Sequence, residues 1–388
     1  MTRIVDIRDL TVPLAGEVAN AVVSFADHTV SLVAVISDAV RNGAPVVGYA
    51  FDSIGRFGQS GILRERMTPR LRAADPRDLL DAAGERLDPA KVLRVALRNE
   101  KPGGHGDRAA AAAALELAIW DLNAKLDDDP AYRTIARAFG RDVRSPAVPV
   151  YAAGGYYYPG ESGARLADEL RRYQAMGFTA FKMKIGGASL AVDLARIEAA
   201  VAVAGNGARV AVDANARFDR KSGLQYARAI APYGLRWYEE VGDPLDFALN
   251  REIAEAYAGP IATGENLFGL ADVRNLLRYG GMRAGRDVFQ MDPGLSYGLT
   301  EYAAMLALME EGGFDRAFAH PHGGHLINLH IAVALGLGGC EAYPGVFRPF
   351  GGYPRECALA DGMVRASDAP GFGLEQKIEL RPLLARLK

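Results

Sequence analysis

The sequence predicts an α/β protein in which eight parallel βα units close into a barrel. From about residue 146 onward, short apolar strands alternate with amphipathic helical stretches, and this alternation is typical of parallel βα units. Polar side chains follow most of these strands, and barrels of this kind hold their chemistry at the carboxyl ends of the strands. An open, doubly wound sheet is the alternative.

The part before the barrel is predicted to be a mixed α+β unit. Three strands are expected over 3–14, 28–38 and 44–53, where branched side chains alternate with polar ones. A helix is expected over 108–126, because alanine and leucine favour helix strongly, and Asp107 is a plausible N-cap. We interpret the six-alanine run inside it as a close-packed helix face.

The barrel strands are expected at 148–155, 180–187, 209–216, 236–242, 261–267, 287–292, 316–324 and 340–346. A glycine-rich stretch at 334–339 follows a predicted helix and precedes a strand. A dinucleotide-binding fingerprint has the opposite order. We therefore expect these glycines to end a helix, which argues against the doubly wound alternative.

Composition narrows the class of partner. The 47 acidic and 45 basic residues give a formal net charge of −2, which offers no general electrostatic reason to bind nucleic acid or acidic lipid. Two cysteines make neither a disulfide framework nor a cysteine zinc site. No signal peptide or transmembrane stretch is evident, so we expect a cytoplasmic protein without nucleic-acid or membrane partners.

Three acids follow consecutive predicted strands at nearly constant spacing. Asp213 and Glu239 are 26 residues apart, and so are Glu239 and Glu265. One strand, one helix and two loops account for each step, so the three carboxylates are expected at one level of the barrel. Carboxylates aimed at one point repel one another unless a cation holds them, and oxygen ligands suit Mg²⁺, for which Mn²⁺ can substitute. Ion pairs at the rim are the alternative for any single acid.

Two lysines precede the first of these acids. Lys182 and Lys184 are two residues apart on one strand and therefore point to the same face. Burial and a nearby cation lower the pKa of an ammonium group, and a lysine that titrates near neutral pH can act as a general base.

A histidine follows the predicted seventh strand, nearly across the barrel. His322 is the candidate for a second proton-transfer group, with Asp292 placed to hydrogen-bond its ring. His320 has the same strand parity and is the main rival. Glu341, on the predicted eighth strand, is a candidate donor to substrate if it is protonated, or else a rim acid in an ion pair.

These residues together resemble the enolase superfamily, in particular its mandelate racemase subgroup. The resemblance covers nearly the whole chain and rests on an ordered set of motifs, which are K-x-K at Lys182 and Lys184, D-x-N at Asp213 and Asn215, Glu239, Glu265, the pair Asp292 and His322, Glu341, and "ALELAIWDLNAKL" before the barrel. Superfamily members pair a lysine or histidine base with Mg²⁺.

The resemblance implies a modified TIM barrel, (β/α)7β, at 146–346, with an α+β capping domain at 1–128 completed by the tail at 347–388. Loops near 17–28 and 51–62 are expected to close over the substrate. The turn "VGDP" after Glu240 is longer than the subgroup pattern, and it leaves Glu240 and Asp243 as further acids near the predicted cation.

Within the subgroup, the resemblance is to D-tartrate dehydratases. It implies that Lys184 removes the proton alpha to a carboxylate and that His322 delivers a proton to the departing β-hydroxyl. Lys182, Asn215 and Glu341 are expected to bind substrate. A racemase or epimerase, a dehydratase of another acid sugar, and a barrel without catalysis remain alternatives. The expected partners are a small acid sugar and further copies of the chain.

One arginine is a candidate for a second substrate carboxylate. Arg217 shares strand parity with Asp213 and Asn215, one step nearer the mouth of the barrel. A salt bridge at the rim is the alternative reading of Arg217.

Overall fold

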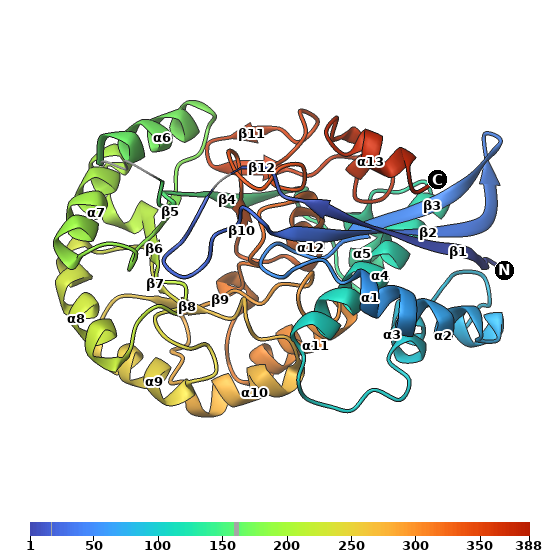
Figure 1. Ribbon diagram of the computed structural model, residues 1–388, viewed down its shortest axis with the longest axis horizontal. Coiled ribbons are helices and arrows are strands. Elements are labelled where there is room, and N and C mark those ends of the chain that lie inside the picture. The colour runs from blue at the N-terminus through green and yellow to red at the C-terminus, as the bar shows by residue number, and fades with distance from the viewer. Residues whose placement is uncertain (17, 159–162) are drawn as a thin grey trace.

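The computed structural model describes residues 1–16, 18–158 and 163–388. A barrel of parallel strands with helices around it lies beside a three-stranded antiparallel sheet with its own helices, and the C-terminal segment lies between the two (Figure 1). This arrangement confirms the predicted fold class, a modified TIM barrel with an N-terminal α+β domain.

The N-terminal sheet has the order β1–β2–β3, and both pairs are antiparallel. Its strands are β1 (Ile4–Pro13), β2 (Thr29–Arg41) and β3 (Ala44–Phe51). Its helical elements are α1 (Ser60–Ile62), a π-helical segment (Leu63–Met67), α2 (Thr68–Arg72), a 3-10 turn (Pro76–Leu79), α3 (Pro89–Ala96), α4 (Gly106–Leu126) and α5 (Ala131–Ala138).

Helix α4 packs against this sheet and is buried on every side. Ala109 through Ala114 are all fully buried, and six consecutive residues go round the whole helix, so the run is close-packed all round and not on one face as predicted. The backbones approach so closely that a Cβ atom added to Gly48 of β3 would lie 2.1 Å from the carbonyl oxygen of Ala118. Small residues on both elements therefore permit the contact.

The predicted N-cap of α4 is wrong. The helix begins at Gly106, with His105 as its N-cap residue. Asp107 lies inside the first turn, where its Oδ1 accepts a hydrogen bond from Nε2 of Gln59 at 3.2 Å. Its carboxylate thus contacts the segment after β3, and still lies at the helix end that favours negative charge.

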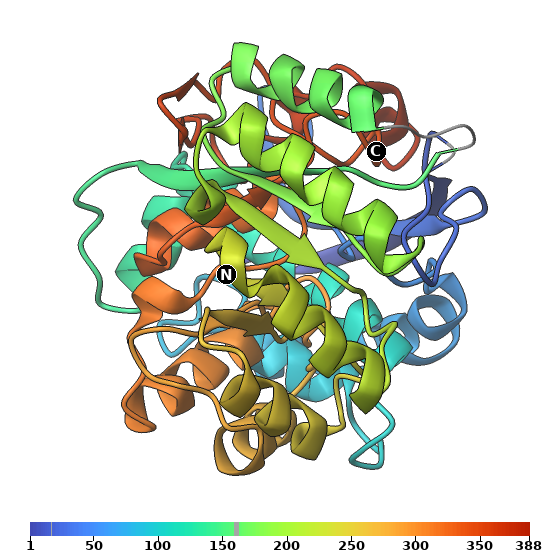
Figure 2. The same cartoon turned by 90° about the vertical axis from the view of Figure 1, so that its left-hand side faces the viewer.

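The barrel is a ring of parallel strands in chain order, closed where β10 pairs with β4. Its strands are β4 (Ala147–Gly154), β5 (Phe181–Lys184), β6 (Val210–Asp213), β7 (Tyr238–Glu239), β8 (Ile261–Thr263), β9 (Val288–Phe289) and β10 (Cys340–Ala342). The helices outside it are α6 (Gly163–Ala175), α7 (Leu190–Ala204), α8 (Arg220–Ile230), α9 (Phe247–Ala256), α10 (Leu270–Tyr279), α11 (Leu299–Glu311) and α12 (Leu326–Leu335). Short 3-10 turns lie at Gly207–Arg209, Ala231–Tyr233 and Arg316–Phe318. Figure 2 shows the helices covering the outside of the strands.

The strand predicted over 316–324 is wrong for most of its length. A 3-10 turn occupies Arg316–Phe318, and one parallel bridge joins Ala319 to Phe289 of β9. Pro321 follows, and proline has no N–H for a ladder hydrogen bond. The segment still fills the place between β9 and β10, so His322 emerges at the predicted position of the ring. The glycines after α12 end that helix as predicted, with Gly336 in the left-handed region at φ 64°.

The C-terminal segment joins the two halves. Its elements are β11 (Leu359–Ala360), β12 (Met363–Arg365), a 3-10 turn (Leu374–Gln376) and α13 (Arg381–Ala385). Strand β12 pairs antiparallel with the first half of β4. The two oxygens of Asp121 in α4 accept hydrogen bonds from the backbone N–H of Phe372 in the tail and of Tyr49 in β3. One buried carboxylate therefore binds the tail, the helix and the sheet together.

Among the helices that the structure describes, none combines the length and the apolar character needed to cross a bilayer.

Candidate active site

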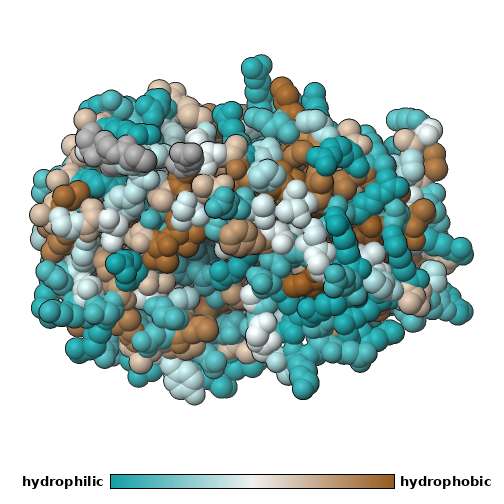
Figure 3. Space-filling view, in the orientation of Figure 1, coloured by the Kyte–Doolittle hydropathy of each residue, from teal (hydrophilic) through white to brown (hydrophobic). Residues whose placement is uncertain are grey.

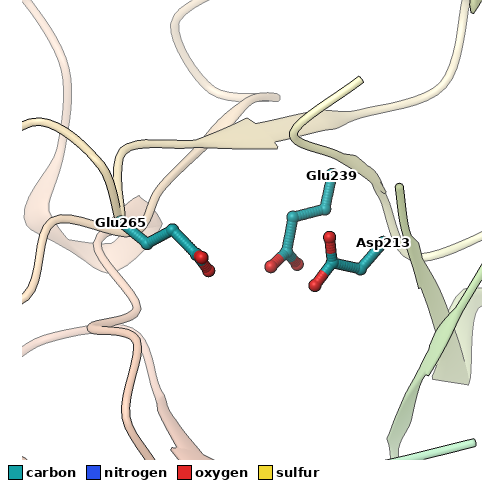
Figure 4. Close-up of side chains that lie close together, drawn as sticks. All are labelled: Asp213, Glu239 and Glu265. Carbon is teal, nitrogen blue, oxygen red and sulfur yellow. The ribbon is translucent and has the colours of Figure 1, made fainter. Parts of the chain in front are cut away.

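Two of the predicted acids end adjacent strands in register. Asp213 of β6 pairs with Glu239 of β7 and, on its other side, with Lys184 of β5. Glu265 lies two residues beyond the end of β8. One oxygen from each of the three carboxylates lies within 4.8 Å of the others, and Figure 4 shows Glu265 facing the pair Asp213 and Glu239.

This donor set fits a divalent cation that prefers oxygen. Two ligands on opposite sides of Mg²⁺ lie about 4.2 Å apart, since each Mg–O distance is about 2.1 Å. The three carboxylate oxygens, which lie within 4.8 Å of one another, are close to that separation. Asp213 and Glu239 are fully buried, and beyond the effect of burial, repulsion from Asp213 raises the pKa of Glu239 to about 8. A cation would relieve that repulsion.

The two lysines have different surroundings. Nζ of Lys182 lies 2.5 Å from Oε1 of Glu239 and 2.8 Å from Oε1 of Glu341. Burial opposes its charge, but these acids raise the pKa of Lys182 well above its usual value. These acids hold Lys182 as an ammonium group, which suits a role in binding anionic oxygen.

Lys184 borders the cavity itself. Its Nζ donates to Oδ2 of Asp213 at 2.5 Å and lies 5.2 Å from the centroid of the Tyr156 ring. One side of the ammonium group is thus held by an acid, and an aromatic face covers another.

His322 is held at both ring nitrogens. Its Nδ1 lies 3.0 Å from Oδ2 of Asp292, and its Nε2 lies 3.0 Å from the hydroxyl of Tyr343. Burial disfavours the imidazolium, but Glu265, Asp292 and Glu341 outweigh it and raise the pKa of His322 to about 9. His322 is therefore placed to hold a proton that it can donate.

The rival histidine lies deeper. His320 packs against Tyr151 and Trp237 inside the barrel, and burial lowers its pKa to about 3. A neutral imidazole among aromatic rings is a core residue, so the structure favours His322.

Glu341 is surrounded by cations. Its Oε2 accepts a hydrogen bond from the N–H of Gly323 at 2.9 Å. Burial opposes its ionisation, but Lys182, His322 and Lys184 lower its pKa. The ionised form is favoured, so the surroundings do not support the protonated donor considered from the sequence.

A cavity of about 260 Å³ brings the candidate residues together. Lys184, Asn215, Glu265 and His322 line it from the barrel, and a hollow is visible near the middle of the face in Figure 3. The Oδ1 atom of Asn215 is buried without a hydrogen-bond partner in the described structure. An unpaired polar atom beside a cavity is available to a ligand.

The capping part supplies the other wall. Of the loop predicted near 17–28, residue 17 lies outside the described residues, while Asn20, Val22, Val23 and Phe25 line the cavity. Ile54, Gly55 and Arg56 of the segment at 51–62 line it as well. Both segments therefore lie over the carboxyl ends of the barrel strands.

Arg217 and Asp243 lie apart from the carboxylate cluster, whereas Glu240 lines the cavity together with Glu265. Arg217 is exposed and is not among the residues that line the cavity. Asp243 is exposed, and its Oδ1 accepts a hydrogen bond from the N–H of Leu245. Glu240 is buried beside the cavity, but its Oε1 accepts a hydrogen bond from Nδ2 of Asn266 at 2.6 Å.

Sequence reasoning missed the aromatic residues of the site. Tyr343 contacts His322, Tyr156 covers Lys184, and the ring of Phe347 lies 4.8 Å from that of Tyr343 and 5.6 Å from that of Tyr156. Phe25 of the capping part packs on Phe347 at 4.9 Å. The position of Tyr343, two residues after Glu341 on the same strand face, was the available signal.

The fold and these side chains together define a parallel barrel in which three convergent carboxylates fit a cation, with a lysine and a histidine lining the same cavity. Residues 165–380 match the family model described as Enolase C-terminal domain-like. The chain therefore belongs to the enolase superfamily, as the sequence motifs predict.

Relatives with assigned activities fit this membership. The chain is 32% identical to 3,6-anhydro-alpha-L-galactonate cycloisomerase of Streptomyces coelicolor over 275 residues, 70% of each chain. It is 24% identical to L-talarate/galactarate dehydratase of Salmonella typhimurium over 365 residues, 93% of this chain and 85% of the relative. The crystal structure of a racemase from Streptomyces coelicolor A3(2) with bound magnesium superposes with a TM-score of 0.77 at 26% identity, covering 99% of each chain.

Proposed function

We propose that this protein is a Mg²⁺-dependent dehydratase of an acid sugar. The observation that carries the proposal is the shared cavity of Lys184 and His322, which emerge from distant parts of the barrel ring beside three convergent carboxylates. Removal of water from neighbouring carbons needs a base for one carbon and an acid for the leaving hydroxyl of the next. The names of the relatives, among them a dehydratase of talarate and galactarate, support an acid sugar as substrate.

Asp213, Glu239 and Glu265 would hold Mg²⁺, and Mn²⁺ can substitute. When bound, the ion supplies Lewis-acid stabilisation, worth several kcal/mol, for the charge that develops on the substrate carboxylate. Lys182 stays charged between Glu239 and Glu341, so it can share in binding a carboxylate oxygen. The buried, unpaired Oδ1 of Asn215 is available to a substrate hydroxyl.

The proton transfers fall to two side chains. Nζ of Lys184, in its neutral form, takes the proton alpha to the carboxylate, and the electron pair of that C–H bond forms the new C=C bond. Nε2 of His322 gives its proton to the β-hydroxyl, which leaves as water when the C–O bond breaks. The enol that remains tautomerises to an α-keto acid. Asp292 holds the imidazole by Nδ1 and so keeps the proton on Nε2 available.

D-Tartrate, which would give oxaloacetate, is the first substrate to test. Its support is the motif resemblance, and the cavity of about 260 Å³ suits a short acid.

The test is a screen of sugar monoacids and diacids with Mg²⁺, with keto-acid formation followed as semicarbazone absorbance. Proton NMR in deuterated water runs in parallel. A keto acid from any member supports the proposal. Deuterium incorporation with inversion and no keto acid would make the protein a racemase or epimerase instead. Mg²⁺ binding without exchange or product across the panel would favour a barrel without catalysis.

A further inference from the structure

The cavity contains a cation on the capping side that the proposed chemistry does not use. Arg56 follows β3 and lines the cavity that Lys184, Glu265 and His322 line from the barrel. The proposed reaction involves one carboxylate, one α-proton and one β-hydroxyl of the substrate, and residues of the barrel would bind or react with all three. Arg56 lines the capping wall of the same cavity and is left without a part in that reaction.

The guanidinium of Arg56 is positioned by neutral groups. Its Nη2 donates to Oδ1 of Asn266 at 2.7 Å, and its Cζ lies 4.9 Å from the ring centroid of Phe268. Nδ2 of Asn266 in turn donates to Oε1 of Glu240 at 2.6 Å. This chain of contacts fixes the guanidinium from the barrel side, so it is preorganised before any ligand enters.

The charge of Arg56 is not balanced by a direct ion pair. Within residues 1–16, 18–158 and 163–388, no carboxylate forms a salt bridge with it; by contrast, the nearby Arg66 and Arg70 both pair with Glu100. A partly buried guanidinium with free donors binds a carboxylate strongly, because its planar fork matches the two oxygens.

We infer that the substrate is a hydroxy diacid and that Arg56 binds the carboxylate at the end remote from the reacting carbon. This inference rests on the proposed function and deepens it, because it separates sugar diacids from sugar monoacids as the substrate class. Arg56, rather than Arg217, is then the residue that meets the second carboxylate. Arg217 is exposed and lies outside the cavity lining.

The experiment compares diacids with monoacids of the same chain length on the Mg²⁺-loaded full chain. The pairs are D-tartrate with the corresponding four-carbon monoacid, and galactarate with galactonate. Enzymes to compare are the native chain, Arg56→Gln, Arg56→Lys, Arg217→Gln and Arg64→Gln. Arg64 is an exposed arginine on the capping part that pairs with Asp9, so it serves as the matched control. Calorimetric binding of each acid is measured beside turnover.

We expect Arg56→Gln to lower kcat/KM and affinity for the diacid roughly 10- to 100-fold, the effect of a lost charged hydrogen bond, while turnover of the monoacid changes little. Arg56→Lys should recover only part of the loss because an ammonium group cannot form the fork. Thermal melting of each variant checks that the fold is kept.

Three results would overturn the inference while leaving a dehydratase in place: preference of the native enzyme for monoacids, equal loss on both members of a pair, or a diacid-specific loss in Arg217→Gln instead. If no acid is dehydrated but Arg56→Gln still weakens diacid binding selectively, the inference holds and the proposed function fails. If no diacid binds but a monoacid is dehydrated, only the inference fails; if no acid of either kind binds or reacts, both fail.

Discussion

The hydroxyl of Tyr343 lies 3.0 Å from Nε2 of His322, the ring nitrogen that Asp292 leaves free. Tyr343 is buried and lines the same cavity. The proton that His322 would deliver to the substrate therefore starts from Nε2, which already contacts the hydroxyl of Tyr343. Such a contact orients the imidazole, and it offers the proton a path through the tyrosine.

Removal of that hydroxyl should slow the reaction more than it weakens binding. We expect Tyr343→Phe to lower kcat roughly 10- to 100-fold, with a smaller change in KM, because a positioned acid contributes in the transition state. The control is Tyr233→Phe, at a tyrosine that bonds Glu198 on the outside of the barrel. Steady-state kinetics on a substrate found in the screen measure both. An unchanged kcat would remove Tyr343 from the proton path.

The two proton-transfer residues should be separable by isotope exchange. Lys184→Ala should abolish α-proton exchange in deuterated water and dehydration together. His322→Asn should abolish dehydration, with a loss of roughly 100- to 10,000-fold, but should leave slow exchange by Lys184. Proton NMR follows the exchange, and circular dichroism checks the fold. Dehydration retained in either variant would contradict the assigned roles.

The affinity for Mg²⁺ should depend on Glu265 and not on Asp243, the acid in the turn after β7. Glu265→Gln removes a charge from the set whose oxygens converge within 4.8 Å, so calorimetry should show markedly weaker Mg²⁺ binding. Asp243→Asn is the matched control, since Asp243 is exposed and caps a turn. Equal affinities for native and Glu265→Gln proteins would exclude Glu265 from the ligand set.

Stability should fall in acid as Glu100 is protonated. Partial burial opposes its charge, but hydrogen bonds from Arg66 and Arg70 lower the pKa of Glu100 to about 2. A folded-state pKa below the unfolded value gives stability above about pH 4.5 that disappears as the pH falls toward 2. After allowance for solvent screening, Glu100→Gln should lower the free energy of unfolding at pH 7 by about 1–2 kcal/mol.

Urea unfolding of native and Glu100→Gln proteins at pH 7 and pH 3 measures this difference, which should shrink at the lower pH. A difference that stays constant between the two pH values would mean that lost packing, not the ion cluster, is responsible.

Local patterns predicted much of the barrel and its site. Spacing along the chain placed Asp213 and Glu239 on one level, and their register in adjacent strands bears this out. Glu265 does not lie at that level. Glu239 pairs with Ala262 of β8, and Glu265 comes three residues after Ala262 along the chain. The long side chain of Glu265 spans this offset and brings its carboxylate to those of Asp213 and Glu239. Strand periodicity alone does not predict this convergence.

The contacts that sequence missed join distant segments. Arg56 reaches the cavity only because the segment after β3 lies over the barrel, and its partner Asn266 is 210 residues away along the chain. Tyr343 meets His322 because β10 lies beside the segment that carries the histidine. Strand parity with Glu341 indicates the face on which Tyr343 lies, but neither contact can be predicted from periodicity, since each depends on how two elements dock.

Two features also constrain how the chain folds while it is being synthesised. Strand β4 pairs with both β10 and β12, and Asp121 bonds both β3 and the tail. The sheet β1–β3 comes before the barrel in the chain, yet the N–H of Phe372 that bonds Asp121 and the strand β12 that pairs with β4 both come after β10. Domains generally fold as units during translation, but here α4 and β4 both bond residues beyond 360, so neither the sheet domain nor the barrel has all of its contacts until those residues are made.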